Sequence, residues 1–458
     1  MNGFAIFILV IGLGLVAWVS ARVKAARFVA AGGTRPHSLP TYHGVYVAMW
    51  TILPAMIFLI VWSLVVPGLV TQSVVADPLA ATLPHEPLER LAMLAEARAL
   101  AEGSLAAAFN PLAAQLAPLY ERAQNHYDMA GLALALILAF AGGAYAYSRL
   151  KPDFRARTRV ERVTMIALLV ASLIAIVTTI GIVASLLFES LRFFAMVSPI
   201  DFLFGLKWSP QDTLVAGEDN GFGMVPLFWG TIFIGAIIAM IVAIPLGLMS
   251  AIYLTQYARP AVRRWMKPIL EVLAGVPTVV YGYFAALTVA PAIRDAAVAI
   301  GISSASTESA LAAGVVMGVM IIPFVSSMAD DSIAAVPASM RDGSLAMGAT
   351  QSETIRKVLL PAALPGVVGG VLLAVSRAIG ETMIVVMAAG LAANFTANPF
   401  ASVTTVTTQI VQLLTGDQEF DSAKTLAAFA LGLVLFLVTL LLNVIALGVV
   451  KKYRESYE

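Results

Sequence analysis

Two ionisable side chains, Arg377 and Glu381, lie four residues apart inside one of the most apolar stretches of this 458-residue chain. If the stretch is one helix, both side chains lie on the same face and can pair. An ionised side chain at the centre of a bilayer costs at least about 2.5–3.5 kcal/mol on insertion scales, so such residues face a protein interior or an aqueous path. Arg377 and Glu381 are therefore candidate functional residues.

Two interpretations of this pair are open. In the first, it is a structural ion pair that holds two helices together. In the second, Arg377 offers its planar guanidinium to a tetrahedral oxyanion in transit, because arginine binds phosphate-like groups in a bidentate manner. Glu381 would then hold Arg377 in place while the path is empty and release it to the anion.

The composition of the chain indicates a polytopic membrane protein. Charged residues make up 12% of the sequence and apolar residues 60%, against about 25% and about 45–50% in average soluble proteins. The mean hydropathy is +0.89. A soluble fold of this size cannot hide that much apolar surface, so its solvent must be lipid. The formal net charge of +1 gives no reason to expect a nucleic-acid partner.

Nine runs of the sequence are long and apolar enough to be transmembrane helices, since a bilayer core of about 30 Å needs about 20 such residues. We therefore expect an all-α polytopic membrane protein. Basic residues follow the first run and none precedes it, which is the reverse of a cleaved signal peptide, so this run counts as a span. The nine runs are Phe4–Ser20, Val45–Val70, Met129–Tyr147, Thr164–Leu187, Pro226–Ala251, Leu273–Ala292, Leu311–Ser327, Val367–Ala389 and Leu426–Val449.

The distribution of Lys and Arg predicts the orientation of the chain. With nine spans and the N-terminus outside, 20 of the 28 Lys and Arg residues fall in the loops assigned to the cytoplasm. This bias is what the positive-inside rule requires. We therefore expect the N-terminus outside and the C-terminus in the cytoplasm.

The densest basic loop, Arg149–Arg162, divides the chain into two parts. Residues 1–150 form an N-terminal extension with three spans and an external stretch, Thr71–Tyr127. Apolar residues recur at helical spacing in that stretch, which predicts one or two amphipathic helices docked on the membrane surface or on a partner. A solvated connector is the alternative. The remaining six spans lie within residues 160–458.

Several kinds of chemistry are excluded by the residues themselves. No Gly-Lys dipeptide occurs, so the chain has no P-loop for ATP. The absence of cysteine excludes disulfides and thiolate metal sites. No H-E-x-x-H motif and no Ser/His/Asp grouping occurs, so we expect no enzyme active site, no metal site and no cofactor bound by this chain. The four histidines are scattered singly, at His37, His43, His85 and His126.

The seventh and eighth spans are separated by a long cytoplasmic loop, Ala329–Pro365. Its pattern predicts a short surface helix, a sharp turn at Gly348 and a second amphipathic helix. Pro361 can begin a further helical segment, because the first residue of a helix needs no N–H. A loop of this length is uncommon unless it docks something, although a helical hairpin resting on the membrane surface would give the same pattern.

The spacing in this loop resembles the E-A-A-x3-G-x9-I-x-L-P motif of permease subunits in binding-protein-dependent ABC importers. The resemblance implies that the last six helices form a MetI-like permease core. It also implies that the loop inserts into a groove of a separate ATPase subunit, which binds ATP and magnesium in place of this chain. The coupling positions are Asp342 for Glu, Gly343 and Ser344 for the two Ala, Val358 for Ile, and the matching Gly348, Leu360 and Pro361.

The stretch Arg377–Thr382, of the form Arg-Ala-x-Gly-Glu-Thr, resembles the membrane subunits of phosphate importers, where the Arg and the Glu are associated with phosphate passage. The resemblance implies that Arg377, Glu381 and Thr382 lie in the substrate pathway. It covers residues 160–458 and assigns no role to the extension. Further stretches agree with it, namely 222–227, 273–282 and 323–327, and the runs 382–386 and 404–408 resemble the C-type rather than the A-type subunit.

The resemblance therefore implies a permease subunit that forms half of the path of an ATP-driven phosphate importer in a bacterial inner membrane. Its implied partners are a second, A-type permease subunit, an ATPase dimer and a periplasmic phosphate-binding protein. The alternatives are a permease for another oxyanion, such as sulfate or molybdate, or the A-type phosphate subunit itself. A more distant alternative is a secondary transporter driven by an ion gradient.

Overall fold

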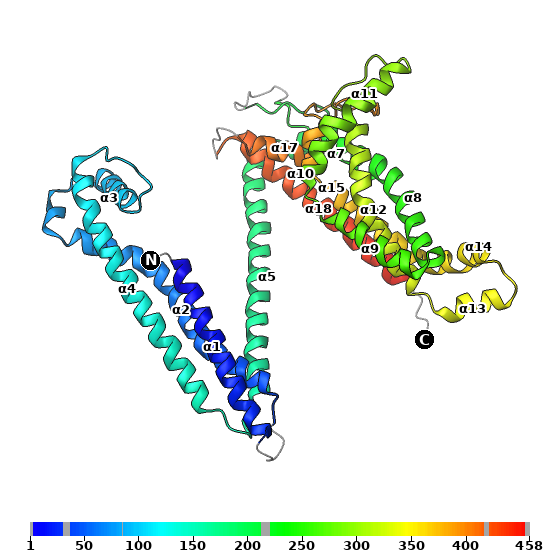
Figure 1. Ribbon diagram of the computed structural model, residues 1–458. Coiled ribbons are helices and arrows are strands. Elements are labelled where there is room, and N and C mark those ends of the chain that lie inside the picture. Colours follow the sequence, from blue (N-terminus) through cyan, green and yellow to red (C-terminus); the bar gives the residue numbers. More distant parts are fainter. Residues whose placement is uncertain (1–2, 31–36, 85, 212–219, 416–420, 454–458) are drawn as a thin grey trace. The chain divides into compact units, whose positions relative to one another are not determined.

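The computed structural model of the chain is almost entirely helical (Figure 1) and describes residues 3–30, 37–84, 86–211, 220–415 and 421–453. Among these residues, eight helices are long and apolar enough to cross a membrane, and a ninth candidate span is a bent pair of helices. Within the same ranges, the only β-structure is an isolated bridge between Trp208 and Phe222. The all-α polytopic architecture is confirmed. His85 lies outside the described residues.

The chain divides into two compact units, unit 1 (Met1–Ile176) and unit 2 (Val177–Glu458). The division falls within α5 (Ala156–Met196), a helix of 41 residues. The elements of unit 1 that precede α5 are α1 (Gly3–Ala30), α2 (Pro40–Val75), η1 (Pro78–Thr82), α3 (Pro87–Ala101) and α4 (Pro111–Ser148).

Small residues bring the long helices of unit 1 close together. A Cβ atom at Gly142 of α4 would overlap the backbone carbonyl of Trp50 in α2, and one at Gly143 would lie 2.7 Å from Oγ1 of Thr51. On the other side of α2, a Cβ atom at Gly44 would lie 2.8 Å from the Trp18 ring of α1. Between membrane helices, small residues of this kind replace the hydrophobic effect by close van der Waals packing.

The stretch Thr71–Tyr127 of unit 1 packs on its own chain. Leu94 and Ala97 of α3 are buried in one cluster with Leu116 and Tyr120 of α4 and with the last turn of α2. The amphipathic helix is therefore confirmed, but its buried face meets α2 and α4 and the stretch is not a plain solvated connector. The third span is longer than expected, because its helix begins at Pro111, where the side chain of the preceding Asn110 accepts a hydrogen bond from the backbone N–H of Leu112.

Unit 2 contains the rest of the chain, and several of its helices include π-helical turns. Its elements after α5 are α6 (Pro199–Phe204), α7 (Val225–Thr231), η2 (Ile232–Ile238), α8 (Ala239–Ile252), η3 (Tyr253–Tyr257), α9 (Pro260–Gly275), α10 (Thr278–Phe284), η4 (Ala285–Val289), α11 (Ala290–Ala299), α12 (Ala310–Ala334), α13 (Ala338–Ala346), α14 (Gln351–Thr354), η5 (Ile355–Leu359), α15 (Leu360–Ile379), α16 (Met383–Ala388), α17 (Val406–Leu413) and α18 (Ala423–Tyr453).

Helix α12 forms the centre of unit 2. Its residues Met317 and Ile321 are fully buried in the largest cluster of the unit, which α8, η2, α15 and α16 complete. A Cβ atom at Gly314 would overlap Ile238, and one at Gly318 would lie 2.8 Å from the carbonyl oxygen of Ala239. The approach of α12 to η2 and α8 therefore requires glycine at both positions.

The sixth expected span, Leu273–Ala292, is not one helix. It is divided between α9 and the segment that begins with α10, and the two helices are bent by 85°. Val276 and Pro277 leave the helical conformation between them, with ψ values of 130° and 135°. Proline disfavours helical conformation in the residue before it, which accounts for the bend at Val276 within this candidate span.

Candidate functional site

The eighth expected span, Val367–Ala389, is broken where its charged residues lie. Helix α15 ends at Ile379, Gly380 follows as its C-cap, and α16 begins only at Met383. Glu381 therefore lies in the short connection between two helices. The hydropathy of the run is continuous across this break, which is why it reads as a single span.

Glu381 is fixed in this break by three hydrogen bonds and is only 9% exposed. Its backbone N–H donates to the carbonyl of Ala378 at 3.1 Å. Its carboxylate Oε1 accepts from the backbone N–H of Met383 at 3.2 Å, and its carbonyl accepts from the hydroxyl of Thr407 at 2.9 Å. The carboxylate thus satisfies a free N–H at the start of α16, as capping side chains do.

Arg377 does not pair with Glu381. It lies in the last turn of α15 and is exposed, and within the described parts of the chain its guanidinium makes no ion pair or hydrogen bond. The predicted pair required both residues on one helix face, and the chain leaves the helix at Gly380 before Glu381 is reached. Thr382 is half-buried, and its hydroxyl donates to the carbonyl of Gly380 at 3.5 Å.

A buried network of hydroxyl groups supports the break from the side of α17. Thr405, the N-cap of α17, contacts the hydroxyls of Thr407 and Thr408 at 3.1 and 3.0 Å. Its neighbour Val406 donates its backbone N–H to the hydroxyl of Thr231 in α7 at 3.1 Å. The hydroxyl that holds Glu381 is therefore itself positioned by two helices.

Gln409 continues this network to the other side of α17. Its Oε1 accepts from Nε1 of Trp208 at 2.9 Å, and its Nε2 donates to the hydroxyl of Thr404 at 3.2 Å. Gln409 and Thr404 are buried. Buried polar groups are retained only where they are hydrogen-bonded, so this chain of bonds helps to hold α17 in position.

Helix α10 packs directly against α16. A Cβ atom at Gly282 would lie 2.9 Å from the carbonyl oxygen of Met383 and 2.9 Å from the sulfur of Met387. Across the bend, the hydroxyl of Tyr281 donates to the carbonyl of Leu273 at 2.7 Å. The bend at Pro277 and the break at Glu381 are thus joined through one close helix contact.

The predicted surface helix, turn and second helix of the long loop are confirmed, and we call residues 338–359 the coupling arm. Helix α13 ends at a turn in which Gly348 has φ +86°. The next helix begins with a capping box, in which Thr350 and Glu353 bond reciprocally. The hydroxyls of Ser344 and Thr354 lie 3.0 Å apart and join the two helices of the arm.

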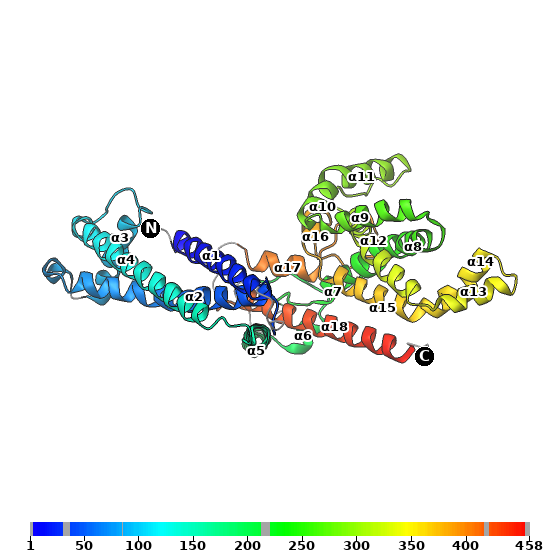
Figure 2. The same ribbon diagram turned by 60° about the horizontal axis from the view of Figure 1, so that its bottom comes forward.

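The family motif places its residues on the outer surface of this arm. Asp342, Gly343 and Gly348 are exposed, and Met347 beside the turn is 89% exposed. Figures 1 and 2 both show α13 and α14 at the end of unit 2 that lies far from α17. The arm is therefore accessible to another chain along its whole turn.

The second half of the motif lies where the arm joins α15. Val358 and Leu360 are half-buried and Pro361 is exposed. Pro361 does not begin a new helix, because the chain stays helical from Gln351 to Ile379. The π-helical turn η5 ends at Leu359, two residues before Pro361, and both a π-helical turn and a proline can bend a helix.

A buried carboxylate holds the base of the coupling arm. Asp330, near the end of α12, is 5% exposed. It accepts hydrogen bonds from Nη2 of Arg263 at 3.0 and 3.2 Å and from Nζ of Lys267 at 2.8 Å. Two positively charged side chains of α9 thus bind α12, the helix that directly precedes the coupling arm.

Two family profiles match the chain. Residues 243–455 match the binding-protein-dependent transport system inner membrane component, and residues 6–178 match a family described as phosphate ATP-binding cassette transporter. The probable ABC transporter permease protein YqgH of Bacillus subtilis is 36% identical over 272 residues, which are 59% of this chain and 84% of YqgH. The chain belongs to the binding-protein-dependent ABC transporter permeases.

Other relatives of this permease carry the name of one transported anion. The probable phosphate transport system permease protein PstC of Methanocaldococcus jannaschii is 31% identical over 51% of this chain and 77% of that protein. PstC 1 of Mycobacterium tuberculosis is 31% identical over 56% of this chain and 83% of that protein. Among solved structures, an inward-facing MetNI methionine ABC transporter aligns with a TM-score of 0.37 at 20% identity, over 50% of this chain and 94% of that one.

The helices of this permease can be predicted from its sequence, whereas most of the residues that hold the helices in place cannot. Thr407 belongs to a threonine run that resembles the C-type subunit, and nothing in that run points to a contact with Glu381. Arg263 and Lys267 counted only toward the orientation of the chain. Their common partner Asp330 lies 67 and 63 residues away along the chain, so no local pattern could show the contact.

Proposed function

We propose that this permease is the C-type membrane subunit of an ATP-driven phosphate importer and forms half of its translocation path. The observation that carries the proposal is Arg377, an exposed guanidinium without a protein partner among the described residues, at the end of a membrane helix. A guanidinium fork binds two oxygens of a phosphate at once. The names of the PstC relatives support phosphate as the anion.

Glu381 has a different role in this proposal from the one that its charge suggests. Its carboxylate caps α16 and its carbonyl is held by Thr407. The residue therefore shapes the break that ends α15 directly after Arg377. Arg377 stays available to the anion because the backbone turns away before it can form a pair.

The other half of the path would come from a second, A-type permease subunit. Next to the break, Met383 is exposed in the single chain, and so are Val279, Val280 and Tyr283 of α10. Apolar side chains of a membrane protein that line neither its core nor a polar path meet lipid or another subunit. The contact of α10 with α16, which follows the break after Arg377, supports a subunit interface near the proposed path.

The energy for transport would come from a separate ATPase dimer that docks on the coupling arm. The chain has no P-loop, so ATP and magnesium would be bound by that partner alone. The exposed turn at Gly348 offers the docking surface, and Asp330 connects its base to α9. Movement of the arm is thereby passed to the helix that precedes the bend at Pro277.

The match to an inner membrane transport component supports a bacterial inner-membrane location. The charge distribution supports a periplasmic N-terminus and a cytoplasmic C-terminus. In this orientation the coupling arm lies in the cytoplasm, where ATP is available. A periplasmic phosphate-binding protein would meet the opposite end of unit 2.

Two measurements on the tagged chain test this function. Purification from a native membrane is expected to yield a second permease and an ATPase with it, and labelled phosphate uptake is expected to be suppressed by unlabelled phosphate alone. Competition by sulfate or molybdate at equal concentration would identify another oxyanion permease. Uptake that survives ATP depletion but is lost with the proton gradient would identify an ion-coupled transporter.

A further inference from the structure

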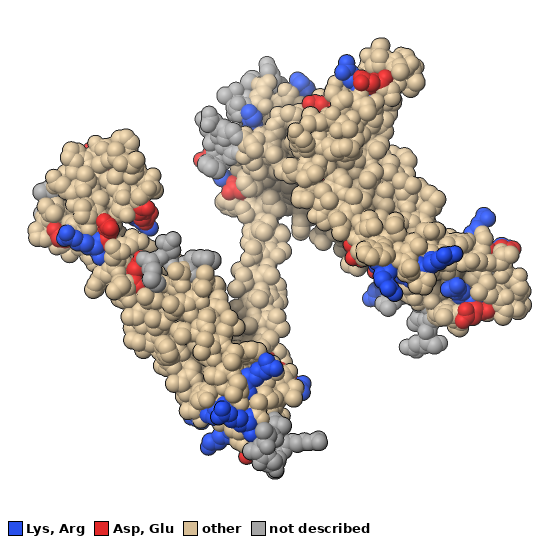
Figure 3. All heavy atoms as spheres, in the orientation of Figure 1, with Lys and Arg blue, Asp and Glu red and all other residues tan. Residues whose placement is uncertain are grey.

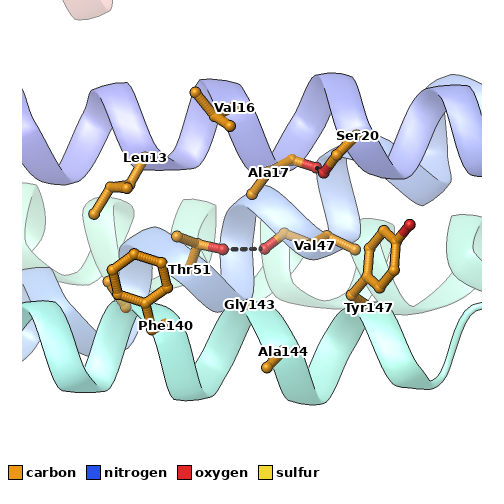
Figure 4. Close-up of a pocket in the computed structure, with 11 residues that line it drawn as sticks. Leu13, Val16, Ala17, Ser20, Val47, Thr51, Phe140, Gly143, Ala144 and Tyr147 are labelled. Carbon is orange, nitrogen blue, oxygen red and sulfur yellow. Dashed lines mark hydrogen bonds between the residues drawn. The ribbon is translucent and has the colours of Figure 1, made fainter.

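Unit 1 contains a groove that has no part in the proposed phosphate path. The groove lies between α1 and α4, with α2 as its floor, and has a volume of about 340 Å³ (Figure 4). Leu13 and Val16 of α1 face Phe140 and Ala144 of α4 across it. All three helices are long and apolar enough to cross a membrane, so the groove opens toward the acyl chains of the bilayer.

The walls of the groove offer hydrocarbon and few polar groups. The hydroxyl of Ser20 donates to the carbonyl of Ala17 at 2.9 Å, and the hydroxyl of Thr51 donates to the carbonyl of Val47 at 2.9 Å. Both hydroxyl protons are therefore used within their own helices. The groove is suited to an apolar chain and not to a polar ligand.

One end of the groove carries a positive charge. Tyr147 lines this end (Figure 4), and Nζ of Lys24 lies 3.0 Å from its carbonyl oxygen and 4.1 Å from the centre of its ring. Among the described residues, no carboxylate forms an ion pair with Lys24. Figure 3 shows further Lys and Arg side chains gathered at this end of unit 1.

We propose that this groove binds one acyl chain of an anionic phospholipid, whose headgroup phosphate lies against Lys24. An apolar groove at membrane depth with a cation at its mouth matches both parts of such a lipid. Basic residues near a membrane surface attract anionic lipids by about 1 kcal/mol each, or about fivefold in affinity. The bound lipid would fill the gap between α1 and α4 and stabilise the three-helix packing of unit 1.

The acyl-chain half of the proposal is tested by filling the groove. Ala144 lines it and is exposed, so Ala144→Phe places a ring in the groove without displacing a buried side chain. Ala133→Phe is the matched control, because Ala133 is an exposed alanine of the same helix outside the groove. The purified full-length complex is delipidated and titrated with phosphatidylglycerol, and bound lipid is counted by native mass spectrometry.

We expect the wild-type chain and Ala133→Phe to bind phosphatidylglycerol alike, and Ala144→Phe to bind it about tenfold more weakly. Equal binding by both variants would overturn the proposal. Loss of the second permease from the Ala144→Phe complex, with lipid binding unchanged, would also overturn it and assign the groove to a protein helix.

The headgroup half is tested by charge. Wild-type protein is expected to bind phosphatidylglycerol more tightly than phosphatidylcholine. In Lys24→Gln, the ratio of the two affinities is expected to fall about fivefold, while both lipids still bind. Lys151→Gln, an exposed lysine at the same basic end, is the control and should keep the preference. The same loss in both variants, or no preference in the wild type, would show that no specific headgroup contact exists.

Discussion

The hydroxyl of Thr407 donates a hydrogen bond of 2.9 Å to the backbone carbonyl of Glu381. This bond joins α17 to the break between α15 and α16 and holds the backbone of the residue that follows the C-cap of α15. Because α15 ends at Ile379, Arg377 and Glu381 do not pair, and the guanidinium is free to meet an anion. The chemistry proposed for Arg377 therefore depends on a threonine 30 residues further along the chain.

Replacement of Thr407 tests this dependence. Thr407→Val removes the donor and leaves the Glu381 carbonyl unsatisfied, which costs about 1–3 kcal/mol at a buried site. We expect lower phosphate uptake at unchanged expression, with Thr407→Ser close to wild type. Thr415→Val is the control, because the hydroxyl of Thr415, just after α17, is exposed and bonds only to the carbonyls of Val411 and Gln412. Equal uptake by Thr407→Val and Thr415→Val would show that the bond does not matter.

The turn of the coupling arm can be tested with two glycines of the same loop. Gly348 has φ +86°, where a side chain costs about 1–2 kcal/mol, whereas Gly343 lies within α13 with no atom within 4 Å of a built Cβ. Gly348→Ala is expected to weaken co-purification of the ATPase and to lower uptake. Because the importer motif has Ala at this position, Gly343→Ala should leave both unchanged and favour the helix by about 0.5–1 kcal/mol. Unchanged ATPase binding and uptake in Gly348→Ala would contradict a docking role.

Asp330 provides a test of how the arm is linked to the membrane. Asp330→Asn removes the negative charge that Arg263 and Lys267 share and leaves a single acceptor oxygen, while these two side chains remain 41% and 38% exposed and so stay hydrated. The expected loss of stability is about 1–3 kcal/mol, between the values for surface and buried pairs. We expect ATP hydrolysis to continue with less phosphate moved per ATP. Asp331→Asn, at the exposed neighbouring position, should leave this ratio unchanged; a similar fall in both variants would argue against the link.

The contact between α10 and α16 is tested at Gly282. A Cβ atom there would meet the Met383 carbonyl at 2.9 Å, so Gly282→Ala must move one helix, at a cost of about 1–3 kcal/mol. We expect a lower melting temperature of the purified complex and slower uptake. In Gly275→Ala, the added methyl has no neighbour within 4 Å, and this variant should match the wild type. Equal melting temperatures for the two variants would mean that the helices are not in close contact.

The long apolar spans could be predicted from the sequence because hydropathy and length are properties of a single segment. The break at Glu381 could not be predicted in this way, because it lies within a run that remains apolar on either side. The bend at Pro277 lies at a proline, which disfavours helix in the residue before it, but hydropathy alone does not show it. A hydropathy pattern shows which residues face lipid or protein but not whether the helix changes direction between them. This is why Arg377 and Glu381 were predicted as a pair on one helix face.

The residues that position the site were hidden from the sequence for another reason. The partners of Asp330 and of Glu381 come from other helices, and only the packing of unit 2 brings them together. The helices and the turn of the coupling arm could be predicted, because its glycine turn and its capping residues lie within a few positions of each other. The groove of unit 1 could not be predicted from the sequence, because it is formed by the packing of three separate helices.

The most direct test of the central claim is phosphate uptake by the Arg377→Gln variant, reconstituted in vesicles with its ATPase and binding protein. We expect ATP-driven uptake to fall at least about tenfold, as loss of a charged hydrogen bond of about 1.5–3 kcal/mol requires, while the complex assembles and hydrolyses ATP. Arg294→Gln, at an exposed arginine of α11, should transport like the wild type. Wild-type uptake by Arg377→Gln, or failure of that variant to assemble, would contradict a direct role of Arg377 in binding the anion.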